Sequence, residues 1–153
     1  MLITNIKTKN KVKLSELNNV ELLKLILKFY DDNKFQDVIN LGNNINLETE
    51  DQYWIYYLRG LSHLKLKNFD KAIIDLRQSL LIRPNSSLCF FQLGIAFHHK
   101  KDFENAKINY ENAIHNKENY FEAILNLGKL YKDFGNYKSS KECLDRALKI
   151  NPN

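Results

Sequence analysis

The sequence has few residues that break helices, with 2 prolines and 5 glycines among 153 residues. This scarcity disfavours a fold of short strands and turns, and it favours long helices. The two cysteines, Cys89 and Cys143, have no metal-binding spacing, so we expect two free thiols in a reducing compartment. No apolar run approaches the roughly 18 residues of a membrane span, and the N-terminus lacks the apolar centre of a signal peptide. We therefore expect a cytoplasmic protein without membrane contact.

The composition is that of one folded domain, with 44% hydrophobic and 12% aromatic residues. The net charge of +5 is modest, and lysines alternate with acidic residues along most of the chain, which argues against a nucleic-acid surface. The one local excess of lysine lies in residues 1–18, which we expect to form a basic, partly ordered N-terminal arm. The folded domain is expected over residues 19–153.

An internal repeat of 34 residues runs through the chain and is marked by three glycines. An aromatic residue follows each glycine after nine positions, and small residues follow at two further fixed places. The landmarks are Gly60, Gly94 and Gly128, then Phe69, Phe103 and Tyr137, then Ala72, Ala106 and Ser140, and finally Ser79, Ala113 and Ala147. Pro84 and Pro152 close two of the units.

This pattern resembles the tetratricopeptide repeat family, whose frame places a large residue, Leu-Gly and an aromatic before the small positions. The third unit carries it most fully, with Phe90, Leu93, Gly94 and Phe97 on one helix face. The resemblance implies an all-α, right-handed α-solenoid of helix-turn-helix repeats, with about eight helices. The expected repeats are a degenerate first one at 19–52, then 53–86, 87–120 and 121–153.

The start of the first helix can be placed from its capping residues. Asn18 is a suitable N-cap, and Glu21 stands three positions later, where a capping-box partner belongs. We expect this helix over residues 19–31.

The resemblance also implies a concave groove lined by the first helix of each repeat, where partner peptides bind. Helix geometry places a second stripe beside the packing stripe, and it is apolar and aromatic over three repeats and polar in the fourth. The predicted groove consists of Leu23, Leu27, Trp54, Tyr57, Leu61, Lys65, Phe91, Gln92, Ile95, His98, Leu125, Asn126, Lys129 and Lys132. The three lysines favour an acidic flank on the ligand.

The predicted function is a non-enzymatic scaffold that binds a protein segment in this groove. The carboxylate clamp of heat-shock-binding relatives is missing, because its places hold Tyr57, Leu61, Gln92, Glu122 and Asn126. Four alternatives stay open. In the first, the chain is the repeat portion of a longer enzyme, such as a glycosyl- or sulfotransferase, and in the second it self-associates through an uncapped C-terminal repeat. In the third, the N-terminal arm covers the groove, and in the fourth a tightly wound superhelix buries the strip as core.

No catalytic, cofactor or metal site is expected. His98 and His99 are adjacent, so they point about 100° apart on a helix and are poorly placed to share one metal ion. His63 stands at a packing position and His115 near a helix end, where partial positive charge is favourable. We therefore expect His98 at the rim of the groove and His99 in contact with water.

Overall fold

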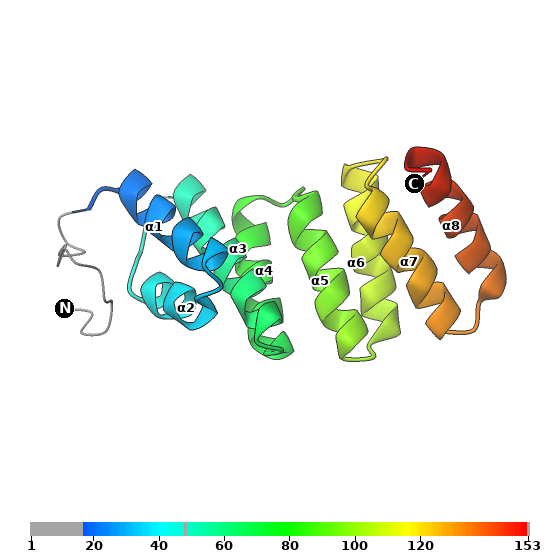
Figure 1. Ribbon diagram of the computed structural model, residues 1–153, viewed down its shortest axis with the longest axis horizontal. Coiled ribbons are helices and arrows are strands. Elements are labelled where there is room, and N and C mark those ends of the chain that lie inside the picture. Colours follow the sequence, from blue (N-terminus) through cyan, green and yellow to red (C-terminus); the bar gives the residue numbers. More distant parts are fainter. Residues whose placement is uncertain (1–16, 48, 153) are drawn as a thin grey trace.

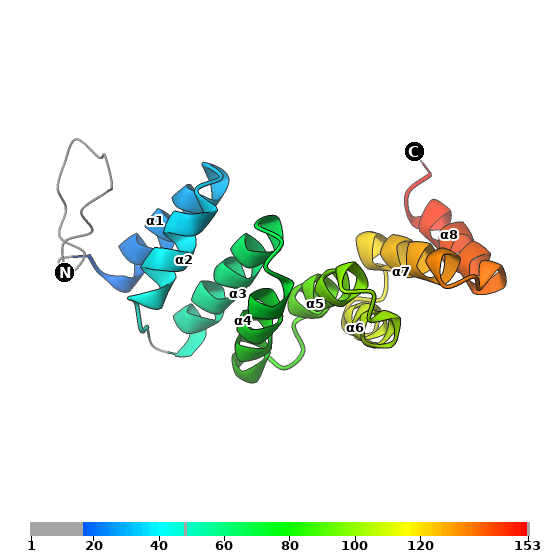
Figure 2. The same cartoon turned by 90° about the horizontal axis from the view of Figure 1, so that it is seen from below.

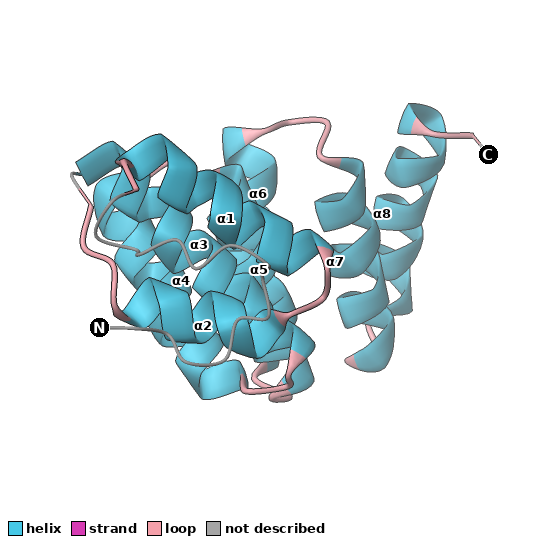
Figure 3. Ribbon diagram, turned by 60° about the vertical axis from the view of Figure 1, so that its left-hand side comes forward, coloured by secondary structure: helices cyan, strands magenta, loops and turns pink. Residues whose placement is uncertain are grey.

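The computed structural model describes residues 17–47 and 49–152, and the expected basic arm lies outside these residues apart from its last two positions. This part of the chain contains eight helices and no strand (Figures 1 and 3). None of these helices is both long and apolar enough to cross a bilayer. The helices are α1 Asn19–Asp31, α2 Phe35–Asn43, α3 Thr49–Lys65, α4 Phe69–Ile82, α5 Ser87–His99, α6 Phe103–Asn116, α7 Phe121–Asp133 and α8 Tyr137–Ile150.

The helices follow one another along the long axis of the molecule as four hairpins, with α1 and α8 at opposite ends (Figures 1 and 2). Each helix packs against its neighbours in the chain, most closely within the pairs α3–α4, α5–α6 and α7–α8. The expected all-α solenoid is confirmed. Because the main contacts between the described hairpins join neighbours in the chain, stability comes from stacking rather than from one central core.

The helix ends follow the local signals in the sequence. The backbone N–H of Glu21 donates to Asn18 Oδ1 at 3.1 Å, and the backbone N–H of Asn18 donates to Glu21 Oε2 at 2.9 Å, which confirms the expected capping box. Pro84 follows the end of α4, where a missing N–H and a fixed φ prevent another turn. Both cysteines are free thiols, with Cys89 buried and Cys143 half-buried.

The hairpin turns also repeat, through one residue with positive φ in each. Asn33, Lys67 and Lys101 have φ of 58°, 59° and 60°, and Gly135 has 81°. These positions are 34 residues apart, so the chain uses the same turn four times although only the fourth repeat has the glycine that favours it.

Helix α3 begins at Thr49, one turn before position 53, where the second repeat is expected to start. Glu50 and Asp51 lie in this first turn, where carboxylates interact favourably with the helix N-terminus. The Nε of Arg83, just after α4, also donates to Glu50 Oε2 at 2.8 Å. The preceding helix, α2, has only 9 residues against 14 in each of the other second helices.

In the last three hairpins, the glycine on the first helix has little room for a side chain. A Cβ at Gly94 would lie 2.5 Å from two ring carbons of Tyr110, and a Cβ at Gly60 would lie 2.8 Å from Leu76 Cγ. At Gly128 the nearest atom is Cys143 Cβ at 3.1 Å. Of these three glycines, Gly94 has the least room for a side chain, because the fully buried Tyr110 ring lies against it.

We predict that Gly94→Ala destabilises the protein by about 1–3 kcal/mol, since the new methyl group overlaps the Tyr110 ring. This loss should exceed the gain of about 1 kcal/mol that alanine brings to a helix interior. Urea unfolding followed by circular dichroism measures it. Gly128→Ala is the matched control, with a smaller loss or a gain, and equal behaviour of the two variants would contradict the packing argument.

Candidate functional site

The predicted groove residues all lie on α1, α3, α5 and α7, the first helices of the four repeats. These first helices contact one another across repeats, α1 with α3, α3 with α5 and α5 with α7. Among the described helices, no two second helices make comparable contact. The first helices therefore line the inner side of the stack, and α2, α4, α6 and α8 face outward.

Two predicted groove residues are buried in the core. Tyr57 is 8% exposed, and its ring stacks on Tyr53 with centroids 6.0 Å apart. Phe91 is 9% exposed and packs between Tyr110 and Tyr120, with centroids at 6.1 and 5.1 Å. A ligand on the inner side would meet only the edges of these two rings. Their main contribution is to hold adjacent repeats together.

The other predicted groove residues reach solvent to different degrees. Leu27 is 45% exposed, and five other apolar side chains of the predicted groove are half-buried. These half-buried side chains are Leu23, Trp54, Leu61, Ile95 and Leu125. Lys65, Lys129 and Lys132 are exposed. The inner side is thus an apolar strip with exposed ammonium groups nearby, and its assignment as a binding surface stays a prediction.

Trp54 is held by neighbours on two sides, although part of it faces solvent. Its ring lies edge-on to Tyr53, with centroids 4.9 Å apart. The guanidinium carbon of Arg83 lies 5.3 Å from the Trp54 ring centroid and 4.1 Å from that of Tyr53. The Tyr53 hydroxyl and Ser86 Oγ share a hydrogen bond of 2.8 Å. The tryptophan is therefore pre-organised, which lowers the entropy cost of packing a ligand against it.

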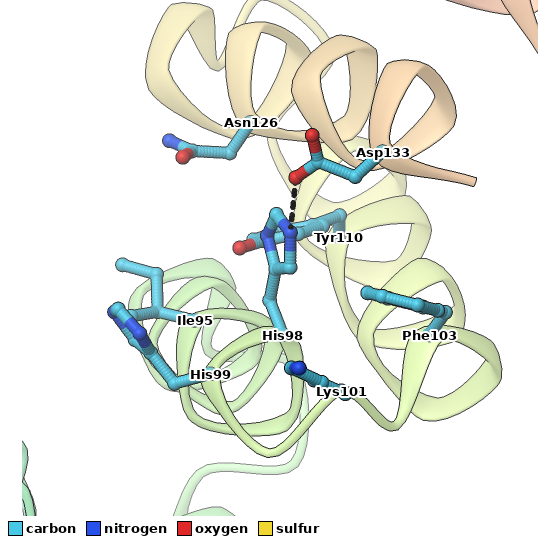
Figure 4. A pocket seen from close by; sticks show the side chains of 8 residues that line it. All are labelled: Ile95, His98, His99, Lys101, Phe103, Tyr110, Asn126 and Asp133. Carbon is cyan, nitrogen blue, oxygen red and sulfur yellow. Dashed lines mark hydrogen bonds and ion pairs between the residues drawn. The ribbon is translucent and has the colours of Figure 1, made fainter. Parts of the chain in front are cut away.

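A pocket of about 740 Å³ opens between the third and fourth repeats (Figure 4). Helix α5 provides one wall and α7 the other, with α6 and the α5–α6 turn completing the lining. The lining residues are Ile95, His98, His99, Lys101, Phe103, Tyr110, Asn126 and Asp133. Its volume is in the range of pockets that hold small molecules or side chains of a partner.

The histidine pair links three repeats. His98 Nε2 lies 3.0 Å from Asp133 Oδ2, so α5 is connected forward to the end of α7 (Figure 4). The His99 ring stacks on Phe69 at the start of α4, with centroids 5.0 Å apart and an interplanar angle of 10°. His99 is exposed, as expected, but one ring face packs against protein rather than water. The pair therefore orients the third repeat against both of its neighbours.

The structure brings Ile95, His98 and Asn126 of the predicted groove to this pocket. The sequence reasoning missed the contributions of Phe103 and Tyr110 from α6, because their repeat positions marked them as packing residues. Both are packing residues and also line the pocket. Phe103 is the first residue of α6, and the repeat spacing alone could have indicated this position.

The pocket offers a hydrogen-bonding set suited to a peptide. Asn126 Nδ2 already donates to the Glu122 carbonyl at 2.7 Å, which leaves its second N–H and its oxygen for a ligand. Asp133 can accept through Oδ1, because its Oδ2 is bonded to His98, and Lys101 can donate. Burial raises the pKa of the Tyr110 hydroxyl, which therefore stays neutral over the physiological range and keeps its proton to donate. Among the described residues, no group of three or more His, Cys, Asp or Glu side chains is placed to hold a metal ion.

Comparisons with known proteins agree with the repeat pattern. Family models described as tetratricopeptide repeat match residues 53–86, 89–120 and 121–153. No curated protein matches the sequence.

Solved structures with the same fold are similar at low sequence identity. A crystal structure of MamA has a TM-score of 0.78 at 19% identity, and the match covers 88% of this chain and 79% of that one. MamA residues 41 to the end from Desulfovibrio magneticus RS-1 give a TM-score of 0.81 at 14% identity, covering 90% and 78%. YrrB, described as a TPR protein with an unusual peptide-binding site, gives 0.76 at 17% identity, covering 88% and 70%. Identities this low show the shared fold alone.

The burial pattern predicts unequal effects of alanine substitutions at predicted groove positions. Phe91→Ala should lower the free energy of unfolding by about 3 kcal/mol, because it removes a buried ring from between Tyr110 and Tyr120. Leu27→Ala should cost less than about 1 kcal/mol, because that side chain is 45% exposed. Urea titrations of both variants measure the difference. A loss at Phe91 as small as that at Leu27 would place Phe91 in an exposed surface instead of the core.

Proposed function

The chain belongs to the tetratricopeptide repeat family, and we propose that it is a non-enzymatic scaffold that binds a segment of a partner protein along its inner side. The segment is an extended peptide or a helix with apolar anchors. The pocket between α5 and α7 carries this proposal, since apolar and hydrogen-bonding side chains converge there at the end of an apolar strip.

The side chains of the strip favour a peptide with apolar anchors and acidic residues on one flank. Trp54, Leu61 and Ile95 offer apolar contact, and large aromatic side chains at such surfaces dominate binding energy. Lys129 and Lys132 are exposed on α7, near the polar end of the strip. Acidic residues on one flank of the bound segment would therefore be attracted electrostatically, mainly through the association rate.

YrrB lends a coarser kind of support. It is described as a TPR protein with an unusual peptide-binding site. Because this chain has a similar backbone, it has a comparable surface on which a peptide would bind. We propose a chaperone-like or assembly role in the cytoplasm, without nucleic acid or membrane as partner. The fold supplies a rigid surface, and the specificity comes from the side chains on the first helices.

A second candidate function is self-association through the last repeat. Tyr137 is 71% exposed and Leu148 59%, both on α8, and Phe134 in the turn before α8 is 65% exposed. Large exposed apolar side chains grouped on one element mark interaction sites. Sedimentation velocity of the wild type and of Leu148→Glu tests this candidate, which predicts a dimer that the substitution dissociates.

The leading proposal predicts that peptides selected from a random displayed library compete for one inner-side site. Ile95→Ala and Asn126→Ala should each weaken the selected peptides at least about tenfold, equal to 1.4 kcal/mol, because both residues line the pocket. Fluorescence anisotropy with a labelled peptide measures the affinity. Unchanged circular dichroism spectra establish that the variants remain folded.

Ile108→Ala is the matched control, because Ile108 lies on α6, faces outward and is 49% exposed. It should bind the peptides like the wild type. If Ile95→Ala and Asn126→Ala also bound the peptides like the wild type, the inner-side site would be contradicted. In a second arm, Lys129→Glu with Lys132→Glu should lower the association rate of acidic peptides more than that of neutral ones.

A further inference from the structure

The second repeat carries polar side chains at three positions where the other repeats are mostly apolar. Arg59, His63 and Asp75 occupy these positions. In the first, third and fourth repeats, the position of Arg59 holds Leu25, Leu93 and Leu127. The position of His63 holds Phe29, Phe97 and Tyr131. The position of Asp75 holds Leu41, Asn109 and Cys143. Packing of a helical hairpin does not require a charged group at any of them, because three other hairpins of the same chain do without.

The three polar side chains meet inside the second hairpin. Arg59 Nη2 donates to Asp75 Oδ1 at 2.8 Å, and His63 Nε2 lies 3.7 Å from Asp75 Oδ2. The side chains of Asp75 and His63 are only 4% and 7% exposed, and that of Arg59 is 19% exposed. Burial of charged and polar groups at this depth destabilises the fold unless every hydrogen-bonding atom is paired.

Three atoms of this cluster are buried without a hydrogen-bond partner. They are Arg59 Nε, His63 Nδ1 and Asp75 Oδ2. The first is a donor and the last an acceptor, while the histidine nitrogen is a donor only when it carries a proton. Leaving each such group unpaired costs about 1–3 kcal/mol, so the cluster is a site where a missing binding partner is to be expected.

A pocket of about 260 Å³ on the outer side of the stack is lined by the three residues that carry these atoms. It lies between α2 and α4 with α3 beneath, away from the inner side where the proposed peptide binds. Ile39, Asn43, Arg59, His63, Lys71, Ile74 and Asp75 line it. Gly42 on α2 makes room for the arginine, because a Cβ there would lie 2.5 Å from Arg59 Cδ.

The charges around the pocket favour an anion. Arg59 on α3 and Lys71 on α4 supply two positive charges, against the single carboxylate of Asp75 on α4. Helix α2 contributes only Ile39 and Asn43 to the lining, and neither titrates. A bound cation in this pocket would be repelled by both positive groups, whereas an anion would be attracted to both.

We propose that this outer pocket binds a small oxyanion, a phosphate or carboxylate group, together with one proton taken up by His63. The proton comes from solvent and converts the imidazole to imidazolium, with both ring nitrogens as donors. His63 Nε2–H then faces Asp75 Oδ2, and His63 Nδ1–H and Arg59 Nε–H face the oxyanion. One anion and one proton thus pair all three unsatisfied atoms, with Lys71 at the pocket wall.

The surroundings of His63 explain why the proton and the anion bind together. Burial, Lys71 and Arg59 lower the pKa of His63, so the free protein holds the imidazole neutral near pH 7. An oxyanion beside Nδ1 offsets the two positive charges and raises this pKa. By linkage, protonation of His63 raises the affinity for the oxyanion by the same factor.

In the absence of an oxyanion, we predict that the melting temperature falls as the pH drops from 7.5 to 5.5. The pKa of His63 is lower in the folded state than the value of 6.5 expected on unfolding, so the unfolded chain binds the proton more readily. Stability is therefore present above the unfolded value and is lost as the pH falls. Thermal unfolding by circular dichroism in a chloride buffer measures this slope, and a flat profile in the wild type would contradict the assignment.

The binding test uses inorganic phosphate and acetate as separate probes, at constant ionic strength maintained with chloride. Phosphate at millimolar concentration should raise the melting temperature by several degrees at pH 6, and NMR of the His63 imidazole should show its pKa raised by about one unit. The imidazole reports protonation directly, so titration of phosphate itself does not confuse the result. A response to acetate alone would assign a carboxylate ligand, and a response to phosphate alone a phosphate ligand.

Lys71→Ala should weaken the response at least about threefold without loss of fold, because Lys71 is exposed. Lys138→Ala, an exposed lysine on α8, is the matched control and should respond like the wild type. A decisive variant combines Arg59→Leu, His63→Phe and Asp75→Leu, which introduces the side chains of the first repeat. It should fold at least as stably and lose the response. An equal response in this variant, or none in the wild type, would overturn the proposal and leave water as the occupant.

Discussion

The architecture depends on the close approach of two helices at one point in each repeat. In the last three repeats a glycine on the first helix faces a large side chain on the second, namely Gly60 with Leu76, Gly94 with Tyr110 and Gly128 with Leu144. The first repeat reverses the order, with Ile26 on the first helix and Gly42 on the second. Its glycine receives the stem of Arg59 from the next repeat instead, so this reversal moves the closest packing from within a hairpin to the boundary between two hairpins.

Much of the fold could be predicted because repeat landmarks report local contacts. The capping box at Asn18, the helix end before Pro84 and the glycine positions all depend on residues close in sequence or exactly one repeat apart. The early start of α3 could not be predicted in this way. It involves Glu50 and Arg83, which are 33 residues apart and belong to no repeat position of the family frame.

The helices that carry the candidate site could be predicted from the sequence, but the burial of its side chains could not. Helix geometry placed Tyr57 and Phe91 on the inner side, and they do lie on first helices. The burial of Phe91 involves a contact across the repeat boundary, with the Tyr120 ring centroid 5.1 Å away. One sequence does not specify how closely adjacent repeats pack, because that depends on many small contacts summed over the interface. The contact of His98 with Asp133 crosses the same boundary.

Two polar residues of the second repeat, Arg59 and Asp75, each directly precede a residue of the close contact between Gly60 and Leu76. Arg59 precedes Gly60 and Asp75 precedes Leu76, so the ion pair is positioned by the same close approach that fixes the helices. A buried pair in so rigid a frame has little freedom to move its unpaired atoms toward water. Gly42 adds the space on the outer side that an arginine needs and a leucine does not. The second repeat thus has an apolar strip on its inner side and a polar pocket on its outer side, and both depend on the close approach of the same two helices.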